Sequence, residues 1–94
     1  MSHFNREERN RVYEELLYKN GQELQSTVAI EEMAEVIKEI TKAKRGKLRR
    51  EQLAEEVADA LIVLEQIGNM FNINDSISSW MDYKIAELKR EVRK

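Results

Sequence analysis

The chain has 94 residues, a net charge of −2 and no cysteine, and its acidic and basic residues are interspersed. This composition excludes disulfides, thiol nucleophiles and thiolate zinc sites, and it indicates neither nucleic acid nor an anionic membrane as a partner. The single histidine, His3, cannot build a Ser-His-Asp triad or a histidine-rich zinc site from one chain. The length predicts a single domain, residues 1–94. The chain has no stretch of ~18 apolar residues and no apolar signal core, so we expect it in the cytoplasm.

Helix is expected throughout, because proline is absent and Glu, Lys, Arg, Leu, Ile and Ala dominate. The first predicted helix covers about residues 5–19. Asn5 and Glu8 have the spacing of a capping box, and Asn20-Gly21 ends the helix. Its apolar residues Val12, Leu16 and Leu17 are predicted to be buried.

The second predicted helix covers about residues 22–43, and basic residues followed by Gly46 mark its end. The third covers about residues 49–71. The fourth opens near Asn74 or Asp75 and has one apolar stripe, made of Ile77, Met81, Ile85, Leu88 and Val92.

The third helix is apolar on two sides, which is typical of a helix buried between neighbours. Ala54, Val57, Leu61, Leu64 and Gly68 lie on one side, and Ile62, Val63 and Met70 lie near Asp59 on the other. One short chain has little material to cover both sides. We therefore expect an all-α, four-helix-bundle-like fold around an antiparallel helical hairpin, completed by formation of a homodimer or homotetramer.

Asp59 interrupts the apolar run of the third helix, and an unpaired buried carboxylate is costly. Glu56 lies on the same face, three residues earlier, and Glu32 and Glu35 repeat this spacing in the second helix. The pairs Glu32–Asp59 and Glu35–Glu56 share one midpoint, at Arg45-Gly46. An antiparallel turn there brings all four carboxylates together, because neighbouring helix axes lie only ~8–10 Å apart.

Four converging carboxylates need a positive partner, and none of them has Lys or Arg at i±4. A hard divalent cation, Mg²⁺ or Mn²⁺, suits such all-oxygen ligands. A solvated acidic face is the alternative for Glu32 and Glu35 alone; the position of Asp59 and the shared midpoint favour the metal site. Glu31 and Glu39 are interpreted as flanking residues, and Gln25, two turns before Glu32, as a substrate contact or a cap of the site.

Three features follow one another along the chain: the motif EExxE at Glu31–Glu35, a basic connector, and the motif ExxD at Glu56–Asp59. In this order of features, the chain resembles the all-α nucleoside triphosphate pyrophosphohydrolases of the MazG-like superfamily. The surrounding GQELQSTVAIEEMAEVI and LAEEVADALIVLEQI look like the small phage and Firmicutes branch. The resemblance covers roughly residues 21–88.

This resemblance implies Mg²⁺-dependent cleavage of a (deoxy)nucleoside triphosphate to the monophosphate and pyrophosphate, with a role in nucleotide-pool house-cleaning. Carried onto this chain, it makes Glu32, Glu35, Glu56 and Asp59 the metal ligands and catalytic residues. Several relatives have a Lys-Tyr-Pro element near the C-terminus that grips phosphate, whereas this chain reads WMDYKIAELKREV. Tyr83 and Lys84 are candidates for that role.

Two alternatives stay open. One is phosphoribosyl-ATP pyrophosphohydrolase, although the Tyr-His that follows the Asp motif in that family is missing here, where Ala60-Leu61 follow. The other is a non-catalytic helical interaction module whose acids bind a structural metal or a basic partner.

Overall fold

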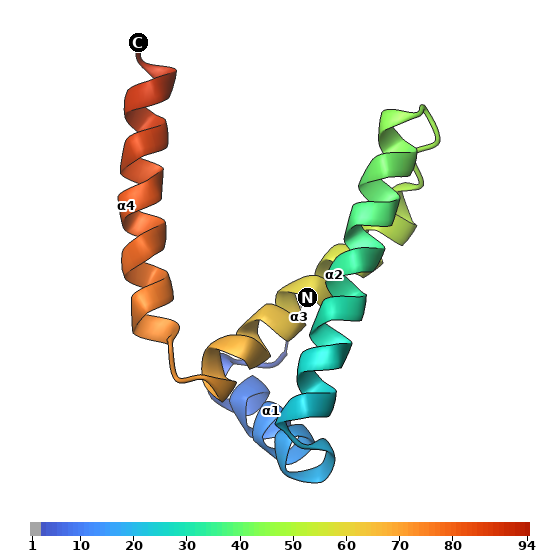
Figure 1. Ribbon diagram of the computed structural model, residues 1–94, viewed down its shortest axis with the longest axis vertical. Helices are drawn as coiled ribbons and strands as arrows, with labels where there is room; N and C mark the ends of the chain where they lie inside the picture. The colour runs from blue at the N-terminus through green and yellow to red at the C-terminus, as the bar shows by residue number, and fades with distance from the viewer. Residues whose placement is uncertain (1–2) are drawn as a thin grey trace.

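The computed structural model describes residues 3–94, which form four α-helices joined by short connections (Figure 1). The helices are α1 (Arg6–Asn20), α2 (Gln22–Lys44), α3 (Arg50–Met70) and α4 (Asn74–Val92). No strand occurs among the described residues, so the predicted all-α class is confirmed. The predicted helix ends agree with the observed ones to within one residue or two.

Local hydrogen bonds explain why the helices begin and end where they do. The Asn5 side chain accepts from the backbone N–H of Glu8 at 2.8 Å, and the Glu8 carboxylate accepts from the backbone N–H of Asn5 at 3.4 Å. This is the predicted capping box. At the end of α2, Gly46 has φ +80°, and the N–H groups of Gly46 and Lys47 donate to the carbonyls of Ala43 and Lys42. This Schellman motif needs the left-handed backbone that glycine adopts without cost.

Helices α2 and α3 form an antiparallel hairpin, and their mutual contact is the largest between any two helices. α1 lies across the end of this hairpin that is remote from the 45–49 connection (Figure 1). The buried apolar side chains are few: Tyr13 on α1, Ala29 on α2, and Ala60 and Val63 on α3. Such a small core is marginal for a chain of this length.

The predicted burial of Val12 is wrong: Val12 is 49% exposed, and its neighbour Tyr13 is buried instead. The orientation of α1 is set by polar contacts with α3. Tyr13 Oη donates to Glu65 Oε1 at 2.6 Å, and Arg6 and Arg9 form ion pairs with the same carboxylate at 2.7 and 3.1 Å. These contacts turn the Tyr13 side of α1, and not the Val12 side, toward α3.

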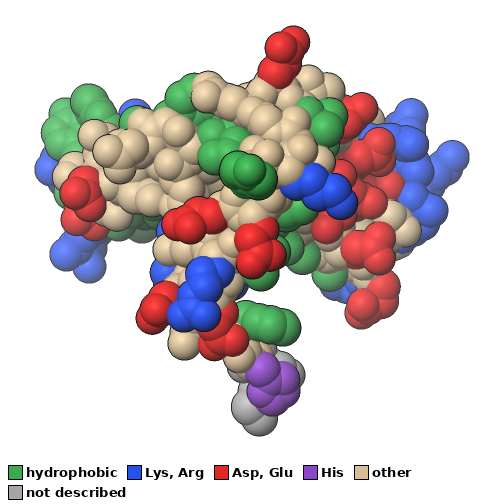
Figure 2. All heavy atoms as spheres, turned by 90° about the horizontal axis from the view of Figure 1, so that it is seen from below, with side chains coloured by type: hydrophobic (Ala, Val, Ile, Leu, Met, Phe, Trp, Pro, Cys, Tyr) green, Lys and Arg blue, Asp and Glu red, His purple; other side chains and the backbone are tan. Residues whose placement is uncertain are grey.

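α4 extends away from the hairpin and touches only α3 among the other helices (Figure 1). None of its residues is buried, and hydrophobic side chains are exposed over it, at the left of Figure 2. One side of α3 is exposed as well, including Leu61 at 59% and Leu64 at 47%. One chain therefore leaves uncovered part of the apolar surface that its sequence provides.

No helix within residues 3–94 combines the length and the apolar character that crossing a membrane requires.

Candidate metal centre

Three of the four predicted acids meet between α2 and α3. Glu32, Glu56 and Asp59 each offer a carboxylate oxygen, and these oxygens lie within 4.8 Å of one another. Glu56 is buried, whereas Glu32 and Asp59 are partly exposed. The group comprises two acids one turn apart on α3 and one acid facing them from α2. The arrangement requires the antiparallel register that the midpoint at Arg45-Gly46 predicts.

The Arg49 guanidinium, which pairs with Glu39, acts on this group from a distance, because the pKa of Arg49 is raised first by Glu39 and in addition by the charge of Glu56. Within the part of the chain that the structure describes, no ion pair involves Glu32, Glu56 or Asp59. Glu56 has one neutral partner, because Gln52 Nε2 donates to its Oε1 at 2.8 Å. Carboxylates this close together repel one another with energies on the order of several kcal/mol when all are ionised. A bound cation would remove that repulsion.

The ionisation of Glu32 reflects the same crowding. Its pKa is raised above the ordinary value, first by burial, then by the Asp59 carboxylate beside it, and further by Glu56 and Glu35. Burial and neighbouring carboxylates both disfavour the charged form. The donor set therefore fits a hard divalent cation, which favours carboxylate oxygens and stabilises their charged form.

Glu35 lies outside the group of three. Its side chain is exposed, and its effect on the pKa of Glu32 is the weakest of the three neighbouring carboxylates. It lies almost one turn after Glu32, nearer the connector between α2 and α3. Glu31 is exposed too. Glu35 is thus close enough to act on the site electrostatically, and its role as a ligand stays a prediction.

Glu39, interpreted above as a flanking residue, lies inside the hairpin and is only 3% exposed. Arg49 Nη2 approaches its Oε2 at 2.7 Å and Lys42 Nζ at 3.5 Å, while its Oε1 is buried without a hydrogen-bond partner. The hydrogen bond from Arg49 holds the pKa of Glu39 below its ordinary value. Glu39 therefore belongs to an ion pair that closes the connector end of the hairpin. The only sequence signal for this ion pair was the presence of basic residues in the connector between α2 and α3.

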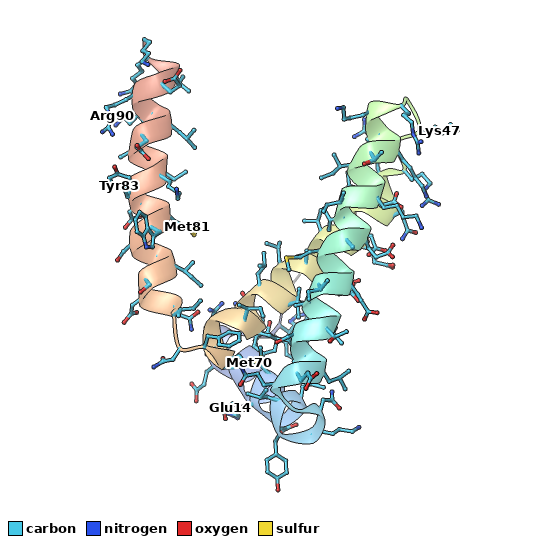
Figure 3. The ribbon with its side chains drawn as sticks, viewed as in Figure 1. Glu14, Lys47, Met70, Met81, Tyr83 and Arg90 are labelled. Carbon is cyan, nitrogen blue, oxygen red and sulfur yellow. The ribbon has the colours of Figure 1, made fainter. Side chains whose placement is uncertain are left out.

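The three predicted substrate contacts lie in different places. Gln25 is 6% exposed, and its Oε1 accepts from Asn20 Nδ2 at 3.0 Å. Tyr83 lies exposed on α4 (Figure 3), and so does Lys84. Both contact Trp80, with Lys84 Nζ 5.7 Å from the centre of its ring. Because α4 extends away from the hairpin, Tyr83 and Lys84 are not brought to the acids of their own chain (Figure 1).

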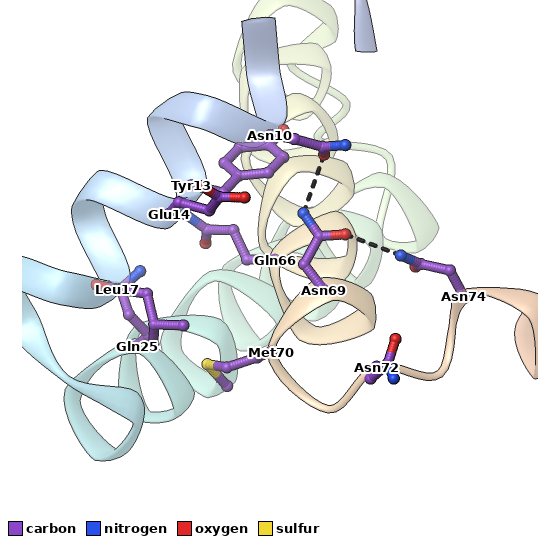
Figure 4. Close-up of a pocket in the computed structure, with 10 residues that line it drawn as sticks. All are labelled: Asn10, Tyr13, Glu14, Leu17, Gln25, Gln66, Asn69, Met70, Asn72 and Asn74. Atoms are coloured by element: carbon purple, nitrogen blue, oxygen red, sulfur yellow. Dashed lines mark hydrogen bonds between the residues drawn. The ribbon is translucent and has the colours of Figure 1, made fainter. Parts of the chain in front are cut away.

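A cavity of about 270 Å³, which sequence reasoning missed, lies between α1 and the two helices of the hairpin and reaches the start of α4 (Figure 4). Its lining is rich in amides. Asn69 Nδ2 donates to Asn10 Oδ1 at 2.9 Å, and Asn74 Nδ2 donates to Asn69 Oδ1 at 2.8 Å. Gln25 also lines it. The only sequence signal for this cavity was the position of Gln25, on the same face as Glu32.

Comparison of the chain with protein-family profiles, with curated proteins and with solved structures found no match. The resemblance to the MazG-like superfamily therefore rests on the residues quoted above.

Proposed function

We propose that this protein hydrolyses a (deoxy)nucleoside triphosphate to the monophosphate and pyrophosphate with the help of Mg²⁺ or Mn²⁺, and so maintains the nucleotide pool. The convergence of Glu32, Glu56 and Asp59 without a basic partner among the described residues carries this proposal. The MazG-like motif provides the reaction class. The chemistry needs no side-chain nucleophile, so the lack of cysteine and the presence of a single histidine are compatible with it.

The roles of the residues follow from their positions. Glu32, Glu56 and Asp59 would hold the metal, with Glu35 as the predicted fourth acid. The metal would neutralise phosphate oxygens and lower the pKa of a bound water. Gln52 holds the Glu56 carboxylate in place through its 2.8 Å hydrogen bond. Second contacts of this kind orient metal ligands and are costly to remove.

The proposal includes a MazG-type bundle completed by a second copy of the chain, in a homodimer or homotetramer. Two uncovered apolar surfaces support it: the stripe of α4, where Ile85 is 60% and Leu88 58% exposed, and the side of α3 with Leu61 and Leu64. Surfaces of this kind on a soluble helical chain mark protein contacts. In such an assembly, α4 of one subunit would cover the hairpin of another.

A product assay tests the proposed reaction. We expect wild-type protein with Mg²⁺ to release a nucleoside monophosphate and pyrophosphate from at least one member of a panel of ribo- and deoxyribonucleoside triphosphates. Glu56→Gln should lower kcat by at least a hundredfold, because it removes a buried member of the group. Glu31→Gln is the matched control, since Glu31 is exposed and next to Glu32. Glu39→Gln is a poor control, because it would also break the ion pair with Arg49.

Release of orthophosphate and a nucleoside diphosphate would contradict the proposed reaction, and equal loss in Glu56→Gln and Glu31→Gln would contradict the proposed site. Lack of turnover with every nucleotide would instead favour a helical interaction module. The exposed apolar stripe of α4 is the observation that supports this second candidate.

A further inference from the structure

The amide-lined cavity has a regular spatial relation to the acids. Gln25 precedes Glu32 by seven residues on α2, and Gln66 follows Asp59 by seven residues on α3. Seven residues are almost two helical turns, or ~10.5 Å along the axis, and they return to the same face within ~20°. The pair Gln25–Gln66 also shares the hairpin midpoint of Glu32–Asp59. The two glutamines therefore repeat the arrangement of the acids, two turns nearer the open end of the hairpin.

The lining of the cavity does not suit phosphate. It contains no lysine or arginine, and its one charged residue is Glu14, which is exposed. Six amide side chains dominate, joined by the aromatic ring of Tyr13 and the apolar side chains of Leu17 and Met70. Such a surface, rich in amide donors and acceptors and with one aromatic ring, is suited to a neutral, planar heterocycle with hydrogen-bonding groups on its edge.

Within the described residues, three of the six amides of the lining, Gln25, Gln66 and Asn72, form no hydrogen bond with another amide of the cavity. The side chain of Gln66 makes no hydrogen bond to any residue within 3–94, and Gln25 uses only its Oε1, toward Asn20. Asn10, Asn69 and Asn74 form a row in which Asn69 links the other two (Figure 4). This row holds one wall of the cavity in place. Gln25 and Gln66, on the two facing helices of the hairpin, and the exposed Asn72 are left as the groups available to a ligand.

The size of the cavity indicates how much of a ligand it holds. Its volume is about 270 Å³, whereas pockets that enclose a whole drug-sized molecule have ~300–1,000 Å³. A cavity of this size suits one ring system and not a complete nucleotide. The ~10.5 Å between the glutamines and the acids is a separation that a sugar and a phosphate ester can bridge.

We infer that the cavity is a nucleobase site, in which Gln25 and Gln66 form hydrogen bonds to the edge of the base while the triphosphate extends toward Glu32, Glu56 and Asp59. This inference rests on the proposed function, because it names the part of the substrate that the acids do not bind. Selection among bases then depends on the amides. A base that leaves a partly enclosed amide without a partner binds more weakly than one that pairs with it.

Nucleosides test the site independently of hydrolysis, because they lack phosphate and need no metal. We would titrate metal-free protein with the common ribo- and deoxyribonucleosides at millimolar concentration and follow the side-chain amide signals by NMR. We expect at least one nucleoside to bind and to shift the Gln25 and Gln66 signals. Gln66→Leu should weaken this binding about tenfold or more, and Gln66→Glu, which keeps the size of the side chain, should weaken it as well.

Gln22→Leu is the matched control, because Gln22 is exposed at the start of α2 and lies outside the cavity. Its nucleoside affinity should equal that of the wild type, and circular dichroism should show that each variant is folded. Binding of a nucleoside at Gln66 supports the site even if no triphosphate is hydrolysed. The site would be overturned, and the proposed function left intact, by the following result: the protein hydrolyses triphosphates but binds no nucleoside, and both Gln66 variants keep the KM and base preference of the wild type.

Discussion

Replacing Asp59 with asparagine should separate two effects of the acid cluster on the stability of the fold. Without metal the carboxylates repel one another and destabilise it, and with metal their binding of the ion stabilises it. The three carboxylates have oxygens within 4.8 Å of one another. A pair of unit charges at that distance repels by about 3.5 kcal/mol at an effective dielectric constant of 20. The partial exposure of Glu32 and Asp59 reduces this value, and any separation shorter than 4.8 Å increases it. Without metal, Asp59→Asn should therefore be as stable as the wild type or more stable.

With divalent metal, the wild type should be more stable than Asp59→Asn. A ligand that binds only the folded state at a hundred times its Kd stabilises it by about 2.7 kcal/mol. For a chain of this size, that corresponds to an increase in Tm of about 10–20 °C. The wild type should show this increase with Mg²⁺ or Mn²⁺. Asp59→Asn should lose most of it, because it keeps only two of the three converging carboxylates.

Thermal denaturation followed by circular dichroism, with increasing MgCl₂ or MnCl₂ at constant ionic strength, measures both effects. Asp82→Asn is the matched control, since Asp82 is exposed on α4 and forms no ion pair within residues 3–94. It should respond to metal like the wild type. An unchanged metal response in Asp59→Asn, or no response in the wild type, would refute the assignment of a metal centre to this cluster.

Three further predictions concern stability and assembly. Burial raises the pKa of Glu65, but the hydrogen bonds from Tyr13 and Arg9 and the charges of Arg6 and Arg9 outweigh it, so the pKa is lowered. The resulting stabilisation is present above about pH 4.5 and is lost as pH falls below it, and Glu65→Gln should flatten this part of a pH–denaturation profile. Urea denaturation should show that Arg49→Gln lowers the free energy of unfolding, because it leaves the carboxylate of Glu39 without its 2.7 Å partner, whereas Arg50→Gln should change little. Sedimentation equilibrium should find a dimer or tetramer that Leu88→Lys dissociates; a stable wild-type monomer would contradict the proposed assembly.

The sequence determined the features that depend on neighbouring residues. The helix ends were predictable because capping groups and left-handed residues act within one turn, as Asn5, Glu8 and Gly46 show. The meeting of Glu32 with Glu56 and Asp59 was predictable as well, since helical periodicity and the midpoint of a short hairpin define which residues face each other.

Only the tertiary structure decided the features that depend on distant segments. Burial of Tyr13 in place of Val12 follows from ion pairs of Arg6 and Arg9 with Glu65, more than 50 residues away along the chain. The burial of Glu39, the amide-lined cavity and the extension of α4 away from the hairpin also depend on how the helices pack. Apolar periodicity shows that a helix has an apolar side, but several neighbours can cover that side. The choice among them depends on polar contacts and shapes that exist only once the helices have packed.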